Sequence, residues 1–146
     1  MPYCRGRIAA WMAAALLLVP LLAGAQQADR FGDYEIHYSA MPTGMLNAAV
    51  AEEYRIMRSR TRGMVMITVL RDGEPVEARI DILARDNDDE ITEIGARRVR
   101  DDGWTSYVGT FGVTDGEALT FEITVKPYQG GGPYQIAFRQ TFYTGE

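Results

Sequence analysis

Residues 119–126 read LTFEITVK, and these eight residues carry the clearest strand signal in the chain. Apolar side chains stand at every second position, at Leu119, Phe121, Ile123 and Val125, and polar side chains fill the positions between them. Because successive side chains of a strand point to opposite faces, the pattern predicts a strand with one buried and one solvated face. Such strands are typical of antiparallel sheets that pack on a core through one side.

The same two-residue period recurs on both sides of this strand and is interrupted by clusters of Gly, Asp and Pro. Together with the strand at 119–126, the pattern predicts seven strands, over residues 33–39, 64–70, 76–84, 91–99, 104–113, 119–126 and 134–142. The connecting segments are short enough for hairpins between antiparallel neighbours. About seven short strands predict an all-β fold, an immunoglobulin-like antiparallel β-sandwich, with a small closed barrel as the alternative.

One segment departs from the strand pattern. Residues 47–54 are rich in Ala and Glu, and Leu46, Val50 and Tyr54 are spaced to share one helix face. Asn47 precedes this run and is a favourable N-cap. The sequence therefore predicts one short helix near residues 47–54.

The first 25 residues have the pattern of a secretory signal peptide. Arg5 and Arg7 form a positive start, residues 8–22 carry no charge, and the small residues Ala23-Gly24-Ala25 end the segment. This order predicts cleavage before Gln26 and a periplasmic location. An uncleaved membrane anchor is the alternative, although the apolar run is shorter than the ~20 residues of a spanning helix.

Removal of this leader makes the remaining chain more acidic. The chain has 15 basic and 20 acidic residues, and the leader contains two arginines and no acid, so residues 26–146 have 13 basic and 20 acidic groups and a formal net charge of −7. This balance argues against nucleic-acid binding, and no membrane insertion is expected after cleavage. The only cysteine, Cys4, lies in the leader, so residues 26–146 are expected to form a single domain without disulfides.

The densest positive feature is residues 55–62, where four arginines fall within eight residues. Guanidinium groups suit carboxylates and phosphates, so Arg58, Arg60 and Arg62 are candidate contacts for a small anionic ligand or an envelope protein. In the alternative interpretation, these arginines pair with the protein's own excess acids and join the short helix to the next strand.

No pattern in the chain predicts a catalytic residue, a cofactor site or a metal site. His37 is the only histidine, and only carboxylates are available to complete a metal site around it. Asp86, Asp88 and Glu90 alternate as calcium ligands can, but the glycine and glutamate that an EF-hand loop requires are missing, so a solvated turn is expected. A G-x-S-x-G nucleophile motif is also absent.

Four stretches together resemble the DUF4426 family, small exported domains of Gram-negative bacteria with no assigned function. They are Gly32–Tyr38, Ala51–Tyr54, Arg58-Ser59-Arg60-Thr61-Arg62-Gly63 and Gly132–Tyr143. The family's arginine-serine-x-x-arginine-glycine stretch is intact, whereas Ser39 replaces an asparagine. The resemblance implies a periplasmic β-sandwich over residues 26–146 and supplies no activity, cofactor or catalytic residue.

These observations favour a periplasmic, non-catalytic binding or interaction module whose ligand is not identified. The alternative from a different class is a hydrolase or metal-dependent enzyme that uses acidic residues and His37. A purely structural domain of an envelope complex is a third interpretation. Whether Arg58, Arg60 and Arg62 pair with internal acids is the most direct test of the first interpretation, because guanidinium groups that are already paired are not free to bind.

Overall fold

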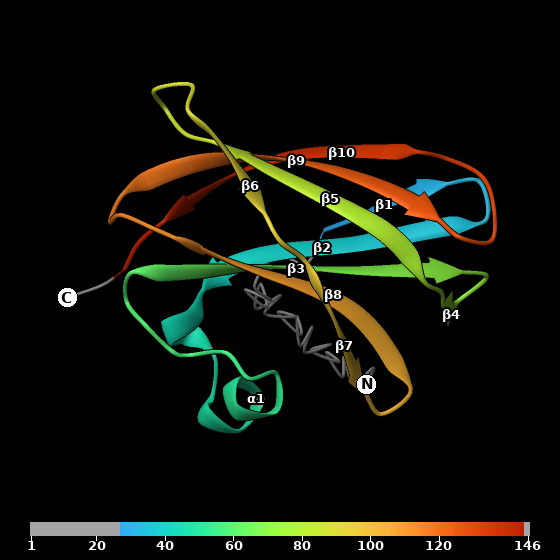
Figure 1. Ribbon diagram of the computed structural model, residues 1–146, viewed down its shortest axis with the longest axis horizontal. Helices are drawn as coiled ribbons and strands as arrows, with labels where there is room; N and C mark the ends of the chain where they lie inside the picture. The colour runs from blue at the N-terminus through green and yellow to red at the C-terminus, as the bar shows by residue number, and fades with distance from the viewer. Residues whose placement is uncertain (1–26, 145–146) are drawn as a thin grey trace, which may run out of the picture.

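The computed structural model describes residues 27–144, which form two antiparallel sheets packed face to face (Figure 1). The first sheet has the order β1 (Gln27–Phe31), β2 (Tyr34–Pro42), β3 (Arg62–Arg71), β8 (Trp104–Gly112) and β7 (Arg97–Asp101), with β4 (Glu74–Pro75) paired to β3. The second has the order β10 (Tyr134–Phe142), β9 (Glu117–Pro127), β5 (Ala78–Arg85) and β6 (Ile91–Ile94). The predicted antiparallel β-sandwich is confirmed. Because residues 27–144 form two separate sheets, the alternative of a closed barrel is wrong.

The main core lies between the two sheets and is built by the alternation that the sequence displays. All four apolar residues of the 119–126 stretch are buried, and Glu122 between them is exposed. Aromatic rings fill the centre, where Phe121 contacts Phe111 edge to face at 5.3 Å and stacks on Phe138 at 5.0 Å between ring centroids. Edge-to-face and offset contacts of this kind stabilise a core beyond the area they bury.

A second, smaller core lies on the outer side of the first sheet. The predicted helix is confirmed as α1 (Ala48–Glu53), and the Asn47 side chain accepts a hydrogen bond from the Val50 N–H at 2.8 Å. A short 3-10 turn, η1 (Thr43–Met45), precedes it. Ala51 of α1, with Leu46 and Ile56 on either side of the helix, packs against Met64 of β3 and Val108 of β8. β3 is therefore buried on both faces near its start, as is common for a strand with a continuous apolar sequence.

The number of strands differs from the prediction. Residues 27–144 form ten strands in place of about seven, because β1 and β4 were not predicted and the expected strand 91–99 is divided. The chain leaves the second sheet after Ile94 and enters the first sheet at Arg97. This crossing requires Gly109 of β8, since a Cβ atom there would lie 2.5 Å from Ile94 Cγ2.

The predicted leader, residues 1–25, lies outside the described residues. Within residues 27–144, no helix is long and apolar enough to cross a membrane. The prediction of a cleaved signal peptide therefore stays a prediction.

Candidate functional site

The arginine-rich segment forms the loop between α1 and β3, and we call residues 55–62 the arginine loop. Ile56 is buried in the smaller core and anchors the start of the loop. Thr43, which is 0% exposed, holds its centre through two hydrogen bonds. Its Oγ1 accepts from the Ser59 N–H at 2.9 Å and donates to the Ser59 carbonyl at 3.2 Å. The loop is therefore fixed to η1 through both backbone groups of one residue.

The remaining small residues of the loop have structural roles as well. Ser59 Oγ accepts from the Thr61 N–H at 3.2 Å, which closes a local turn. Gly63 begins the buried part of β3 beneath Phe111, and a Cβ atom at this position would lie 2.6 Å from the Phe111 ring. The serine and the glycine of the arginine-serine-x-x-arginine-glycine stretch therefore shape the loop and its entry into the sheet.

The three candidate arginines are exposed and have few internal partners. Arg58 donates to the Gly44 carbonyl at 3.2 Å, and Arg62 donates to Thr110 Oγ1 at 3.0 Å. No carboxylate of residues 27–144 forms an ion pair with Arg58, Arg60 or Arg62. Within residues 27–144, the three arginines therefore do not form the ion pairs with the protein's own acids that the alternative interpretation expects. Each guanidinium carries five N–H donors, so most of them are open to solvent.

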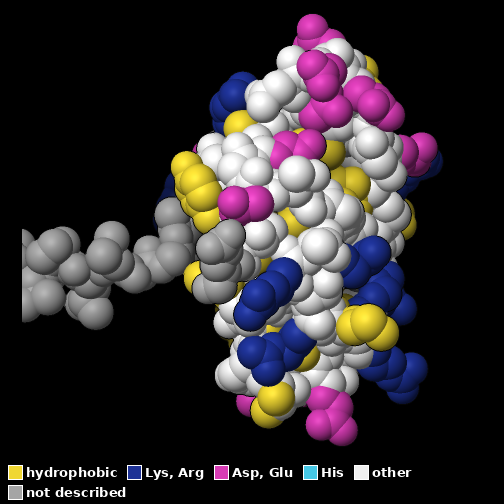
Figure 2. All heavy atoms as spheres, turned by 90° about the vertical axis from the view of Figure 1, so that its left-hand side faces the viewer, with side chains coloured by type: hydrophobic (Ala, Val, Ile, Leu, Met, Phe, Trp, Pro, Cys, Tyr) yellow, Lys and Arg dark blue, Asp and Glu magenta, His cyan; other side chains and the backbone are white. Residues whose placement is uncertain are grey.

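The loop lies at one end of the sandwich, where charge is unevenly distributed. Figure 2 shows this end, with most Lys and Arg side chains in the lower half and most Asp and Glu side chains in the upper half. The acidic turn between β5 and β6, residues 86–90, lies at the top of Figure 1, whereas α1 lies at the bottom. Two long apolar side chains are exposed near Arg58: Met57 (80% exposed) directly precedes it along the chain, and Met45 (74% exposed) directly follows Gly44, whose carbonyl accepts from Arg58. This end thus offers cationic groups beside apolar surface.

Comparisons with known proteins establish the family. The profile of the family described as "Domain of unknown function (DUF4426)" matches residues 28–145, which is most of the chain. The chain belongs to the DUF4426 family. The resemblance noted in the sequence is thereby confirmed, and the arginine loop contains the arginine-serine-x-x-arginine-glycine stretch on which it rests.

Solved structures agree with this assignment. A crystal structure of a DUF4426 family protein from Pseudomonas aeruginosa PAO1 is similar with a TM-score of 0.74 and 27% identity, over 83% of this chain and 97% of that chain. FetP of uropathogenic Escherichia coli strain F11 is similar with a TM-score of 0.59 and 8% identity, over 82% and 94% of the two chains. A copper-bound variant of FetP has a TM-score of 0.57 and 11% identity, over 84% and 97%. At these identities the FetP structures share the fold alone. Among curated proteins, none matches the chain in sequence.

In this DUF4426 domain, His37 lies on the outer face of β2 and is 25% exposed. Its Nε2 is 2.6 Å from Glu35 Oε1, and the other carboxylate oxygen of Glu35 is 3.0 Å from Arg30. His37 therefore has one carboxylate as its neighbour. Residues 27–144 contain no group of three or more His, Cys, Asp or Glu side chains placed to hold a metal ion.

The alternating acids at residues 86–90 form a turn closed by their own backbone. Asp86 Oδ1 accepts from the N–H groups of Asp88 at 2.8 Å and Glu90 at 2.9 Å. Carboxylates of this kind commonly satisfy the backbone of a tight turn. One oxygen of Asp86 is thus engaged in shaping the hairpin, as expected for a solvated turn.

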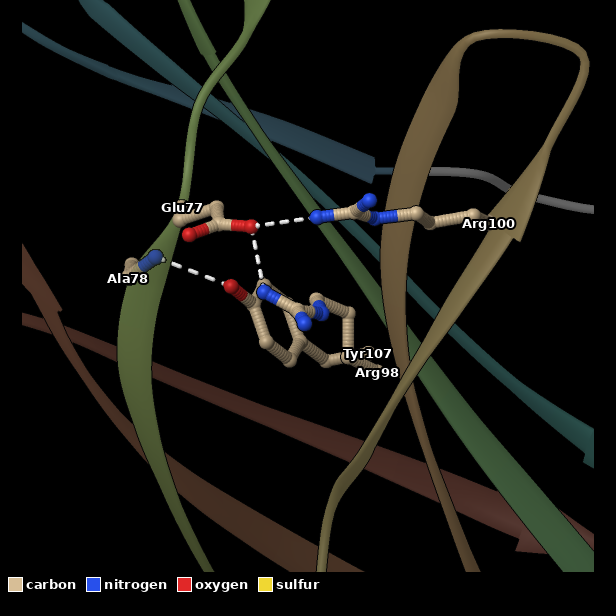
Figure 3. A network of polar contacts seen from close by, with 5 residues as sticks. All are labelled: Glu77, Ala78, Arg98, Arg100 and Tyr107. Atoms are coloured by element: carbon tan, nitrogen blue, oxygen red, sulfur yellow. Dashed lines mark hydrogen bonds and ion pairs between the residues drawn. The ribbon is translucent and has the colours of Figure 1, made fainter.

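Sequence reasoning missed a second polar cluster, which joins the two sheets on the β5–β7 side. Glu77 accepts from Arg98 and, at 3.0 Å, from Arg100, while Tyr107 Oη accepts from the Ala78 N–H at 2.9 Å (Figure 3). A hollow of about 360 Å³ lies beside it. Burial raises the pKa of the Tyr107 hydroxyl, so this group stays protonated as a structural link. Glu77 and Arg98 are 21 positions apart, and no local pattern connects them.

Two carboxyl groups meet where α1 approaches β7. The negative charge of Asp101, together with a hydrogen bond between the two side chains, raises the pKa of Glu53. Burial, followed by the charge of Asp101, raises the pKa of Tyr54 as well. A hollow of about 400 Å³ is lined in part by Tyr54, Asp101 and the exposed Trp104.

Proposed function

We propose that this DUF4426 domain is a non-catalytic binding module of the periplasm that holds an anionic group at the arginine loop. The group belongs to a small ligand or to an envelope protein, and Arg58, Arg60 and Arg62 are its contacts. The observation that carries the proposal is the absence of an ion pair to these arginines within residues 27–144, in a chain whose acids outnumber its bases.

The construction of the loop supports the same conclusion. Repulsion disfavours three arginines within five residues of a loop, and no carboxylate of residues 27–144 forms an ion pair with them. The loop is nevertheless held in one shape by the buried Thr43 and Ile56. A fixed backbone reduces the freedom that the loop loses when its guanidinium groups bind carboxylate or phosphate oxygens.

The proposed location has two supports. The first is the leader pattern of residues 1–25, which predicts export. The second is that FetP, whose fold is similar, was produced for one of its structures in the periplasm of Escherichia coli. A periplasmic domain with exposed arginines would meet acidic segments of envelope proteins and anionic small molecules.

Site-specific photo-crosslinking tests the proposal in intact cells. A photoreactive amino acid replaces Met57, which is exposed and adjacent in sequence to Arg58, and in a matched control it replaces Tyr128, which is also exposed. A crosslinked product is expected from position 57, and the triple change Arg58→Ala, Arg60→Ala, Arg62→Ala should abolish it. A product that persists in the triple variant would contradict the proposal.

Free ligands are tested with the purified protein. Calorimetric titration with inorganic phosphate and with a short glutamate peptide should give saturable heat that disappears in the single variant Arg60→Ala. Arg60 is the informative position because no hydrogen bond ties its side chain to the described residues. Arg79→Ala, which removes an arginine paired with Asp81 at 3.3 Å, is the control and should leave the heat unchanged.

The second candidate is the hydrolase or metal-dependent enzyme built on acidic residues and His37. Its support is the close contact of His37 with Glu35 and the copper bound by a FetP variant of similar fold. Elemental analysis of protein purified without chelator tests it. A stoichiometric ion that is lost in His37→Ala would favour this candidate, and metal-free protein would exclude a resident metal.

A further inference from the structure

The sandwich has four edge strands on its sheet paths, and three of them are protected against pairing with another chain. β1 has five residues and includes Asp29 and Arg30, and β6 has four residues. β7 has five residues, of which four are charged: Arg97, Arg98, Arg100 and Asp101. Short length and charged side chains are the usual means by which proteins prevent pairing between sheet edges.

The fourth edge strand, β10, lacks these protections. It has nine residues with the sequence YQIAFRQTF, which contains no proline and a single charge, Arg139. It pairs with β9 in unbroken register from Tyr134 opposite Val125 to Phe142 opposite Glu117, so no bulge bends it. Within residues 27–144 its outer edge has no strand partner. A long, regular and nearly uncharged edge favours the addition of another strand.

The solvent face beside this edge is hollowed, and three acidic residues, Asp81, Glu93 and Glu122, line the hollow. Asp81 pairs with Arg79 at 3.3 Å, and Glu122 forms a longer, exposed pair with Arg85 at 3.6 Å, which contributes little and can be exchanged for another cation. Ala137 of β10 lies opposite Glu122 of β9, which lies opposite Leu83 of β5, which in turn lies opposite Glu93 of β6. A hollow of about 550 Å³ follows this row, and Asp81 also lines it. Ala137 is the member of the row nearest the free edge, and its small side chain leaves the hollow open from that side.

Arg139 is the positive group of the same strand and shares this solvent face, since it lies two residues from Ala137. Its side chain donates to Asn87 Oδ1 at 3.0 Å, an exposed hydrogen bond to a neutral amide. Such a bond contributes little, so the guanidinium can exchange it for a carboxylate. Arg139 therefore lies two positions along the edge strand from Ala137, which lines the acidic hollow.

We propose that two copies of this chain associate through β10, as antiparallel neighbours related by a two-fold axis at Phe138. In this register Arg139 of each copy lies opposite Ala137 of the other. The next residue inward is Glu122, two strand spacings or about 10 Å from the arginine backbone, which is within reach of the two side chains. A two-fold interface requires one surface to be complementary to itself, and the Arg139–Ala137–Glu122 arrangement meets this requirement.

The association joins the two four-stranded sheets into one continuous sheet of eight strands. Backbone hydrogen bonds along β10 supply the contact, and the two Arg139–Glu122 pairs fix its register. The acidic hollow argues for this occupant over an unrelated acidic segment, which it would repel. None of the residues involved belongs to the arginine loop, so this inference stands or falls separately from the proposed function.

Sedimentation equilibrium of the purified protein tests the inference. At about 100 μM, where a micromolar dimer is largely formed, we expect twice the mass of one chain. Arg139→Glu faces Glu122 of the partner with a like charge and should raise the dissociation constant at least about tenfold. The double variant Arg139→Glu, Glu122→Arg exchanges the two charges and should recover much of the dimer.

Arg60→Glu is the matched control, because it changes the net charge equally on an exposed arginine outside β10, and it should leave the dimer intact. Circular dichroism of each variant verifies that the sandwich is folded. A wild-type protein that remains monomeric at this concentration would overturn the inference. So would a dimer that Arg139→Glu leaves unchanged, or one that Arg60→Glu disrupts as strongly.

Discussion

At the scale of single residues, Thr43 determines the shape of the arginine loop. Tyrosines apart, it is the only buried polar side chain within residues 27–144, and both of its hydrogen bonds go to the backbone of Ser59. A buried hydroxyl is retained where its bonds replace those it loses to water. The three exposed arginines therefore depend on one residue that has no charge and lies beneath them.

Thr43→Val tests this dependence, because valine keeps the volume and removes the hydroxyl. The Ser59 N–H and carbonyl lose their partner, and the free energy of unfolding should fall by about 1–3 kcal/mol. Urea denaturation followed by fluorescence measures the change. Thr61→Val removes an exposed hydroxyl of the same loop and should cost less. An equal loss in both variants would contradict the role of Thr43.

Gly63→Ala tests the close approach of β3 to Phe111. The added Cβ would lie 2.6 Å from the Phe111 ring and 3.0 Å from Val113 Cγ1, so the core must shift. We expect a loss of about 1–3 kcal/mol in the free energy of unfolding. Gly112→Ala is the matched control, since nothing lies within 4 Å of a Cβ atom there. If both substitutions prove equally mild under urea, the packing argument fails.

At the scale of elements, the helix and most strands follow from local pattern, and the division of residues 91–101 does not. Asn47 and the spacing of Val50 and Tyr54 specify α1 without reference to the rest of the chain. By contrast, residues 91–99 alternate only weakly, and the change of sheet after Ile94 brings that side chain against Gly109, far along the chain. Contacts of this kind depend on residues far apart in sequence and have no local signal.

The contact between α1 and β7 gives a pH dependence that belongs to this scale. Asp101 raises the pKa of Glu53 above its ordinary value of 4.5, so the folded state holds that proton more tightly than the unfolded state does. The tighter binding of this proton stabilises the folded state fully at pH values below 4.5, and the stabilisation is lost as the pH rises through the raised pKa of Glu53.

Asp101→Asn removes the repulsion and should raise the melting temperature at pH 7 relative to the wild type. The difference should shrink at pH 4, where the proton is retained. Scanning calorimetry at the two pH values measures the effect. Asp102→Asn, at the neighbouring exposed position, is the control. A gain for Asp101→Asn that is as large at pH 4 as at pH 7 would contradict the assignment.

At the scale of the whole molecule, the alternating pattern around residues 119–126 predicted an antiparallel sandwich, with a closed barrel as the alternative. The candidate site was predictable only in part. The density of arginines in residues 55–62 located it, but whether internal acids neutralise them depends on where the turns at 86–90 and 115–117 lie in space. The link between Glu77 and Arg98 was not predictable, because 21 residues and a change of sheet separate them.

Export is also a property of the whole chain. If residues 1–25 are a cleaved leader, protein recovered from the periplasm should begin at Gln26. Intact mass spectrometry of the cell fractions measures this. An unprocessed N-terminus on cytoplasmic protein would contradict the prediction, and Ala25→Leu should slow processing because signal peptidase requires a small residue there.

The central claim is the proposal that Arg58, Arg60 and Arg62 together bind an anionic group. Side-chain nitrogen NMR during titration with a short glutamate peptide tests it most directly, because each guanidinium reports on its own contact. The account predicts saturable shifts of the Nε signals of these three arginines, while Arg79, already paired with Asp81, stays unchanged. Shifts spread evenly over all exposed arginines, or none at the loop, would contradict it.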